Sequence, residues 1–242
     1  METNKPEVEK ANKTAVIFGG TGLVGKQLLK ILASSHYYKE VISVSRRSAG
    51  IKHRKIREII IPFNAPVKEI GSLKGDDVFV TLGTTLKKAG SKDKFSAIEK
   101  DLVVEIVGWA RKNSFNQLML VTAVGADKES LFFYNRVKGE LEEEILKFDF
   151  WSTHIFRPSL LLGHRNENRF GESIAKVIGR GIDAITGNLL TKYKPVEAEV
   201  VAQAMVAAAQ RFEQGVFYHS SEKLQNLADE YYRNKELKRN HL

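Results

Sequence analysis

The chain has 242 residues, a net charge of +9, 43% apolar residues and no cysteine. The lack of cysteine excludes disulfides, thiolate catalysis and cysteine-ligated zinc. The length and apolar fraction suit a single α/β domain, or such a domain with a small appendage. The positive charge is compatible with nucleic acid or anionic ligands. The basic residues are spread along the chain, however, and match no nucleic-acid-binding motif, so we expect no nucleic-acid partner.

The first 13 residues are polar, and we expect them to form a flexible segment. They lack the apolar stretch that a secretory signal requires. No apolar run in the chain approaches the roughly 18 residues of a membrane-spanning helix. The sequence therefore predicts a cytoplasmic protein without a membrane partner.

Short apolar runs alternate with amphipathic stretches from residue 14 to about residue 160, which is typical of a parallel sheet built from βαβ units. Strands that are apolar on both faces belong in the middle of a sheet covered by helices. The fold class we predict is therefore α/β, a doubly wound parallel sheet of the Rossmann type, in a single domain over residues 14–242. The expected strands span 14–18, 41–45, 57–61, 77–82, 117–122 and 152–157, and the expected helices span 22–34, 66–73, 94–112 and 134–147.

The pattern changes after residue 162. Residues 170–180 and 197–212 are expected to be helical, and residues 215–221 resemble a last strand. Ligands of doubly wound sheets bind outside the carboxyl ends of the strands. We therefore expect residues from about 163 to 242 to form a small C-terminal cap on the substrate side of the sheet.

The most specific passage is "TAVIFGGTGLVGKQLLKIL" at residues 14–32, in which a β-branched strand runs through Gly19, Gly22 and Gly25 into an amphipathic helix. Glycines at such a turn permit a positive φ, allow the backbone to approach a pyrophosphate, and let the helix pack closely on the strand. The helix N-terminus offers free N–H groups and the positive end of its dipole to phosphates. This context predicts a dinucleotide site; the alternative is a glycine-rich turn without a ligand.

The residues after the second predicted strand indicate which dinucleotide is bound. NAD sites generally carry an acidic residue there, about 20 residues after the glycines, that binds the ribose 2′-hydroxyl. This chain has Ser45, Arg46 and Arg47 instead. Two guanidinium groups suit a 2′-phosphate, so NADP is favoured over NAD; the alternative is a solvated arginine pair.

Tyr134 and Lys138 lie four residues apart in a stretch that is expected to be helical, so their side chains share one helix face. A neighbouring ammonium favours the phenolate, which makes the tyrosine a usable proton donor or acceptor. Thr122 stands at the end of the preceding strand, where its hydroxyl can polarise or orient a carbonyl. The same spacing recurs at Tyr231 and Lys235 in a polar C-terminal helix, without a strand end before it.

These motifs resemble short-chain dehydrogenases/reductases of the extended or atypical kind, from "GGTGLVG" through "YNRVK" to "FRPSLLLG". "LGTT", "VGADKES", "FYNRVKGELE" and "FRPSLLL" are similar to the branch typified by the Tat-interacting-protein oxidoreductase and its bacterial relatives. The resemblance covers most of residues 14–212 and involves several motifs in the same order. It implies a Tyr-x-x-x-Lys pair at Tyr134 and Lys138, with Lys138 also binding ribose. Thr122 takes the place of the usual serine, and the asparagine motif after the fourth strand is replaced by "LGTT", so a fourth catalytic residue is not identified.

The resemblance also implies cofactor contacts along the carboxyl edge of the sheet. The expected pyrophosphate contacts come from the glycine-rich turn, the 2′-phosphate contacts from the arginine pair, and the nicotinamide and ribose contacts from the loops after the fourth and sixth strands. In that order these residues are Gly19, Thr21, Gly22, Leu23, Val24 and Gly25; Arg46 and Arg47; Leu82, Gly83 and Thr84; and Pro158.

The predicted function is an NADP(H)-dependent oxidoreductase acting on a small-molecule carbonyl or alcohol. Alternatives are an NADPH-binding regulatory or sensor protein with little turnover, and an NAD-dependent epimerase or dehydratase. A homodimer through the helices that flank the sheet is compatible with the sequence. The histidines show no metal-ligand spacing, so no metal is expected. The acidic run Glu140, Glu142, Glu143 and Glu144 is expected to form the solvated face of the helix that carries Tyr134.

Overall fold

The computed structural model describes residues 11–62, 66–162 and 194–239. Most of the predicted flexible segment and the predicted helix at 170–180 lie outside these residues. Lys13, the last residue of that segment, already belongs to the first strand.

Seven parallel strands form the central sheet, as predicted, in the order β3-β2-β1-β4-β5-β6-β9. The order reverses direction between β1 and β4, which is the arrangement of a doubly wound sheet. A second, two-stranded sheet pairs β7 with β8. The strands are β1 (Lys13–Phe18), β2 (Tyr38–Ser45), β3 (Ile56–Ile60), β4 (Asp77–Val80), β5 (Gln117–Val121), β6 (Ser152–Arg157), β7 (Leu161–Leu162), β8 (Val196–Glu197) and β9 (Gly215–Ser220).

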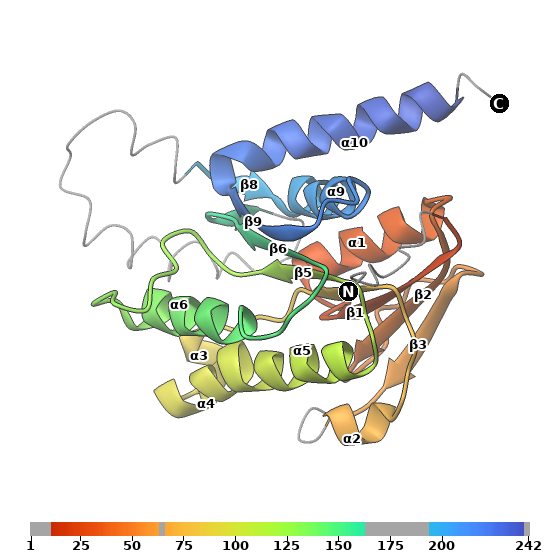
Figure 1. Ribbon diagram of the computed structural model, residues 1–242. Coiled ribbons are helices and arrows are strands. Elements are labelled where there is room, and N and C mark those ends of the chain that lie inside the picture. Colours follow the sequence, from red (N-terminus) through yellow and green to blue (C-terminus); the bar gives the residue numbers. More distant parts are fainter. Residues whose placement is uncertain (1–10, 63–65, 163–193, 240–242) are drawn as a thin grey trace, which may run out of the picture.

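Helices cover both faces of the sheet (Figure 1). Helices α1, α9 and α10 lie on one face, and the remaining helices lie on or near the other. Their bounds are α1 (Leu23–Ser34), α2 (Pro66–Ile70), α3 (Leu86–Ala89), α4 (Lys92–Ser96), the π-helical turn η1 (Ala97–Asp101), α5 (Leu102–Lys112), α6 (Phe133–Ile145), α9 (Ala198–Ala209), the 3-10 turn η2 (Ser221–Lys223) and α10 (Leu224–Arg239).

Strand alternation divides the interior into two apolar cores. In β1, Ala15 and Ile17 point to the core under α1 and α9, whereas Val16 and Phe18 point to the core under α5 and α6. Successive side chains of a strand face opposite sides of the sheet, so a strand that is apolar throughout is buried on both faces. The unbroken apolar run of β1 therefore has its explanation in the two helical layers.

The described part of the predicted cap belongs to the body of the domain. Strand β9 pairs with β6 as the seventh strand, and α9 packs against α1 and contributes to the same core. The apolar run in α9 is buried almost all round, which requires cover on several sides. Residues 198–239 therefore lie in the body of the domain, whereas β8 pairs with β7 beyond the carboxyl end of β6. Among the residues that the structure describes, no helix is both long and apolar enough to cross a membrane.

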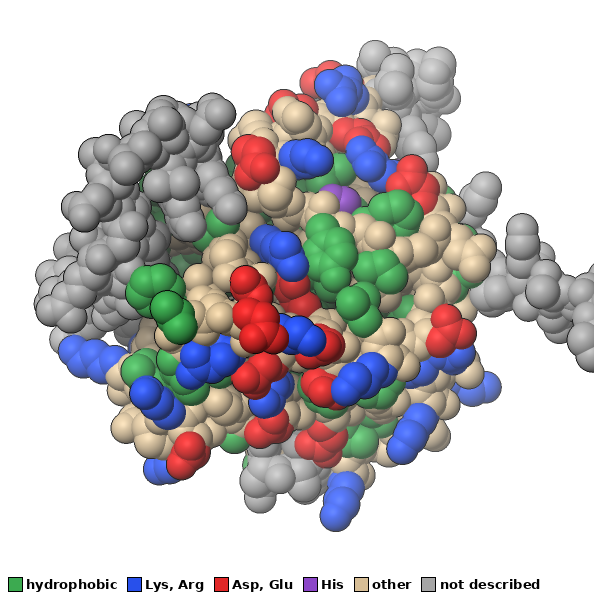
Figure 2. All heavy atoms as spheres, turned by 60° about the vertical axis from the view of Figure 1, so that its left-hand side comes forward, with side chains coloured by type: hydrophobic (Ala, Val, Ile, Leu, Met, Phe, Trp, Pro, Cys, Tyr) green, Lys and Arg blue, Asp and Glu red, His purple; other side chains and the backbone are tan. Residues whose placement is uncertain are grey.

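The outer face of α6 carries ion pairs with neighbouring lysines, as expected of a solvated helix face. Acidic and basic side chains are intermixed on the face shown in Figure 2. The pairs are Glu140 with Lys100, Glu143 with Lys128, and Glu144 with Lys147.

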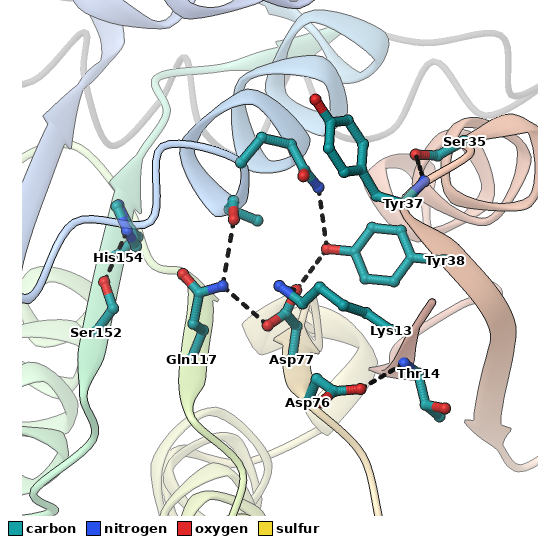
Figure 3. Close-up of polar contacts among 12 residues, drawn as sticks. Lys13, Thr14, Ser35, Tyr37, Tyr38, Asp76, Asp77, Gln117, Ser152 and His154 are labelled. Carbon is teal, nitrogen blue, oxygen red and sulfur yellow. Dashed lines mark hydrogen bonds and ion pairs between the residues drawn. The ribbon is translucent and has the colours of Figure 1, made fainter. Parts of the chain in front are cut away.

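A buried polar network runs along the amino ends of the strands (Figure 3). Lys13 forms an ion pair with Asp77, and both side chains are fully buried. The Tyr38 hydroxyl donates to Asp77 at 2.5 Å, and the Gln117 amide donates to it at 3.0 Å. Each of these residues is the first of its strand. The network therefore joins β1, β2, β4 and β5 at the edge opposite to the one where ligands of such sheets bind.

Two buried histidines are stacked between β6 and β9. The ring nitrogens His154 Nδ1 and His219 Nε2 lie 2.9 Å apart, and His154 Nε2 lies 3.0 Å from the Ser152 hydroxyl. That hydroxyl donates to the carbonyl of Glu213, so it accepts from His154. Neutral rings satisfy this chain of hydrogen bonds, whereas a second proton on His154 would face the donor of His219. Burial lowers the pKa of His154 to about 3 and that of His219 to about 4.

Acidification from pH 7 to pH 5 is therefore expected to reduce the free energy of unfolding by about 2 kcal/mol for each of these histidines. The unfolded chain takes up protons below its ordinary histidine pKa of about 6.5, whereas the folded chain leaves both rings neutral, so stability falls as pH falls. In urea unfolding, a His219→Gln variant should lose about 2 kcal/mol less unfolding free energy between pH 7 and pH 5 than the wild type, because one buried histidine is absent. The matched variant at exposed His53, His53→Gln, should retain the full loss. An equal loss in both variants would contradict the assignment.

Candidate active site

The glycine-rich turn closes tightly on the loop that follows β4. Gly19 has a φ of +95°, and a side chain there would place Cβ 2.7 Å from the carbonyl group of Thr81. A Cβ at Gly25 would overlap the carbonyl oxygen of Gly19. Glycine is required at both positions because the turn and α1 approach each other without room for a side chain. This packing brings the start of α1 to the carboxyl edge of β1.

The N-terminus of α1 presents backbone groups at that edge. The helix begins at Leu23, and its N-cap, Gly22, has no side chain that could accept from the first turn. The first turn contains no acidic residue. The N–H group of Gly22 itself donates to the Gly19 carbonyl at 2.9 Å. Free N–H groups and the positive end of a 12-residue helix dipole suit a phosphate, so these residues fit the pyrophosphate of a dinucleotide.

The predicted arginine pair follows directly after β2, at the same edge. Strand β2 pairs with β1, with Val44 opposite Phe18, so Arg46 comes just beyond the level at which the glycine turn begins. Both arginine side chains are exposed. The Ser45 hydroxyl is buried and donates to the carbonyl of Arg47 at 2.6 Å, which fixes the backbone of the pair. The structure thus brings the turn and the arginine pair to one edge of the sheet.

The loop after β4 connects the turn with the predicted tyrosine pair. Its first residue, Thr81, donates its N–H group to the carbonyl of Phe18 at 2.9 Å. Three residues later, the N–H group of Thr84 donates to the carboxylate of Glu99. Gly83 is exposed, and Leu82 packs against the core under α5. One side of this loop therefore contacts the glycine turn, and the other contacts η1.

Tyr134 and Lys138 occupy one face of α6, as the sequence predicts. Tyr134 is in the first turn, and its ring centroid lies 5.8 Å from that of Phe95. The ammonium group of Lys138 forms an ion pair with Glu99, and these two residues are only 3% and 2% exposed. Glu99 therefore bridges α6 and the loop after β4, because its second carboxylate oxygen accepts from Thr84. The glycine turn and the tyrosine pair are joined by this chain of contacts.

The pKa of the Tyr134 phenol differs from the expectation. Burial raises the pKa above its ordinary value, the Lys138 ammonium opposes this effect, and Glu99 adds to it. For Lys138, burial disfavours the ammonium, but Glu99, Tyr134 and Glu142 together outweigh this effect and the pKa is raised. The expected lowering of the phenol pKa by Lys138 is thus outweighed. The main cause is the burial of the phenol, and the Glu99 carboxylate adds a smaller effect in the same direction.

Thr122 follows β5 at the carboxyl edge, but its hydroxyl has a partner within the protein. It donates to Glu142 at 2.6 Å, and Glu142 also accepts from the guanidinium of Arg157. Glu142 is 4% exposed, so the prediction of a solvated residue was wrong at this position. Its carboxylate is stabilised by Arg157 and Thr122, and these contacts compensate for its burial. With its proton held by Glu142, Thr122 can donate to a substrate only after releasing this bond.

The other predicted cofactor residues lie at the same edge but differ in exposure. Pro158 is buried directly after β6, and its carbonyl accepts from Val124 at 2.9 Å. Val24 is buried in the core, so only its backbone faces the turn. Thr21 and Leu23 are partly buried. By contrast, Tyr231 packs against the core from α10 and has no place at this edge.

Two acidic residues of the site were not identified from the sequence. Glu99 stands in the π-helical turn η1, and Glu142 stands in the acidic run of α6. Irregular π turns within helices are frequent at functional sites, but a π turn leaves no clear sequence signal. The spacing of Glu142 four residues after Lys138 is the only signal that could have placed it on the inner face. Among the described residues, no group of three or more histidine or acidic side chains could hold a metal.

Comparisons with known proteins identify relatives of the whole domain. A search of protein-family models found no match. Protein FMP52-1, mitochondrial, from Scheffersomyces stipitis is 35% identical over 211 residues, which cover 84% of this chain and 91% of the relative. Protein HTATIP2 from Rattus norvegicus is 31% identical over 176 residues, covering 71% and 72% of the two chains. The names of the FMP52 relatives contradict the prediction of a cytoplasmic protein, since they place these relatives in mitochondria.

Solved structures share the fold at low sequence identity. MoeE5 in complex with UDP-glucuronic acid and NAD has a TM-score of 0.64 and 15% identity, and the alignment covers 85% of this chain and 75% of MoeE5. Human epimerase family protein SDR39U1 with NADPH has a TM-score of 0.59 and 14% identity, with coverage of 86% and 74%. These structures confirm the predicted Rossmann-type fold. The curated relatives show that the chain belongs to the family of HTATIP2 and FMP52 proteins.

Proposed function

We propose that this protein is an NADP(H)-dependent oxidoreductase that interconverts a carbonyl and an alcohol. The observation that carries the proposal is the contact chain from the glycine turn through Thr81, Thr84 and Glu99 to Lys138, four residues after Tyr134. These contacts would hold the Tyr134 phenol near the loop after β4, which packs against the glycine turn. A proton donor next to a dinucleotide site is the arrangement that carbonyl reduction requires.

The residues of the site have separable roles in this proposal. The backbone of the glycine turn and the α1 N-terminus would hold the pyrophosphate, and Arg46 and Arg47 would hold the 2′-phosphate that distinguishes NADP from NAD. When bound, the nicotinamide supplies the hydride. Tyr134 would donate the proton to the carbonyl oxygen, and Lys138 would orient the ribose and the phenol. Thr122 would orient the carbonyl once its hydroxyl leaves Glu142.

A protein that binds NADPH as a regulatory signal, with little turnover, is the second candidate. One observation favours it: the Thr122 hydroxyl is occupied by Glu142. In this contact Thr122 lacks the free hydroxyl that would orient a carbonyl. An NAD-dependent epimerase or dehydratase is less favoured: the fold neighbour MoeE5 was solved with NAD, but the arginine pair here favours a 2′-phosphate over a bare ribose.

The cofactor assignment is tested by thermal unfolding with NADPH and with NADH. At 100 times its dissociation constant, NADPH should stabilise the folded protein by about 2.7 kcal/mol. The Arg46→Ala/Arg47→Ala variant should lose about tenfold or more in NADPH affinity while retaining its NADH affinity, because charge-assisted bonds to the 2′-phosphate are lost. The Arg111→Ala/Lys112→Ala variant removes an equal charge from the exposed end of α5 and should behave like the wild type.

Failure of both nucleotides to shift the unfolding transition would contradict a dinucleotide site. Equal losses in the two double variants would contradict the assignment of the arginine pair. Turnover is then measured as NADPH oxidation against a panel of aldehydes and ketones. Binding of NADPH without any turnover would favour the regulatory candidate. The names of the FMP52 relatives also lead us to propose a mitochondrial location, which cell fractionation tests.

A further inference from the structure

The ion pair between Glu99 and Lys138 is the most deeply buried charge pair on the carboxyl side of the described structure. Glu99 comes from η1 and Lys138 from α6, and the carboxylate also accepts the N–H group of Thr84. Both oxygens of Glu99 are therefore engaged, one by a cation and one by the backbone of the nucleotide loop. A buried ion pair is retained at a desolvation cost, so such a pair calls for a functional explanation.

The Glu99–Lys138 pair supplies the charges that surround the Tyr134 phenol. Lys138 and Glu99 are the two charged groups that act on Tyr134, and Glu142 adds a second carboxylate near Lys138. The aromatic ring of Phe95, from the helix that leads into η1, contacts the tyrosine ring. The phenol thus has an apolar neighbour and a charge pair whose members oppose each other. An unpaired lysine would favour the phenolate, whereas a lysine paired with a carboxylate favours it less, because Glu99 acts on the phenol in the opposite direction to Lys138.

We propose that Glu99 is a positioning residue that keeps Tyr134 in its protonated form by holding and neutralising Lys138. This inference rests on the proposed function and specifies the direction of the reaction. A protonated phenol donates its proton to the oxygen of a carbonyl as hydride arrives at the carbon, and the phenolate that results is reprotonated from solvent. The site is therefore built for carbonyl reduction with NADPH rather than for alcohol oxidation, which needs a phenolate base.

The same two helices provide a matched control. Lys100 of η1 pairs with Glu140 of α6 at 2.7 Å, with the signs of the charges reversed. This pair is partly exposed and is absent from the groups that act on Tyr134. Glu140→Gln therefore removes an ion pair between η1 and α6 without changing the charges that face the phenol. Glu99→Gln removes the buried pair and retains an oxygen for the N–H group of Thr84.

The experiment is a pH titration of the protein in which ultraviolet absorbance reports the formation of tyrosinate. The same titration is recorded for the Tyr134→Phe variant and subtracted. The difference isolates the ionisation of Tyr134 without requiring a substrate. In the wild type its midpoint should lie above the ordinary tyrosine value of about 10. For Glu99→Gln, the Tyr134 titration is obtained by subtracting that of the Glu99→Gln/Tyr134→Phe variant. Its midpoint should fall by about one to three pH units, because Lys138 is no longer paired with a carboxylate. Glu140→Gln should leave it unchanged.

A wild-type midpoint below about 10 would overturn the inference, and this measurement does not depend on the folding of any Glu99 variant. An unchanged midpoint in a folded Glu99→Gln protein would reduce Glu99 to a structural role. A matching acidic shift in the pH profile of reduction would support the inference further, since a purely structural defect lowers turnover without moving the profile. If no carbonyl is turned over, the proposed function fails while the titration still decides the role of Glu99.

Discussion

A Tyr134→Phe variant is expected to lose about 10²- to 10⁴-fold in turnover of any carbonyl that the wild type reduces, with NADPH binding unchanged. The substitution removes the hydroxyl and retains the ring that contacts Phe95. Since proton transfer by a positioned side chain accounts for a factor of this size, the loss should appear in kcat. The measurement is the initial rate of NADPH oxidation, together with a thermal-shift titration of NADPH.

Tyr231→Phe is the control for this prediction. Tyr231 also precedes a lysine by four residues, but it lies in α10 and packs against the core on the opposite helical layer. The variant should keep the rate and the nucleotide affinity of the wild type. A Tyr134→Phe enzyme with unchanged turnover would remove the proton-transfer role. Equal losses in the two variants would point to a general effect on stability.

An Asp77→Ala variant is expected to lose about 3–5 kcal/mol of unfolding free energy. Asp77 is fully buried, pairs with Lys13, and accepts hydrogen bonds from Tyr38 and Gln117. Its removal leaves an ammonium and two polar donors in the interior without their acceptor, and an uncompensated buried charge is the main cost. Urea unfolding at neutral pH measures the change from the midpoint and slope of the transition.

Glu40→Ala is the matched control, because Glu40 pairs with Arg57 on the surface and both side chains are substantially exposed. A surface pair of this kind contributes about 0–1 kcal/mol. The double variant Lys13→Met/Asp77→Leu should be less destabilised than Asp77→Ala, since it removes both charges. The assignment would be contradicted if Asp77→Ala cost no more than Glu40→Ala.

The strands and the nucleotide turn could be predicted because their signals are local. An unbroken apolar run such as β1 indicates a central strand, and β6 begins and ends at the predicted residues. The expected strand at 41–45 extends back to Tyr38, whose ring packs in the apolar core beside Phe79 and whose hydroxyl donates to Asp77. Gly25 is required because α1 packs closely on Gly19 and Gly20, which lie a few residues away, whereas Gly19 is also constrained by Thr81 of the loop after β4.

The described part of the predicted cap and the position of Glu142 in α6 differ from the expectation for a common reason. Residues 215–220 join the main sheet because β9 pairs with β6 at the edge of the sheet. The burial of Glu142 depends on Arg157, which is brought to it from β6. Both outcomes are contacts between segments that the sequence keeps apart, and no local pattern encodes them.

The Rossmann-type sheet, the glycine turn at the start of α1 and the shared helix face of Tyr134 and Lys138 could be predicted, because hydrophobic periodicity, glycine geometry and helix spacing act over a few residues. The partners and charges of these groups could not, because they depend on contacts with distant segments. The tertiary structure placed the Glu99 carboxylate on Lys138 and the Glu142 carboxylate on Thr122. Burial strengthens such contacts, because charges and dipoles interact more strongly where water is excluded, and burial is set by the packing of distant segments.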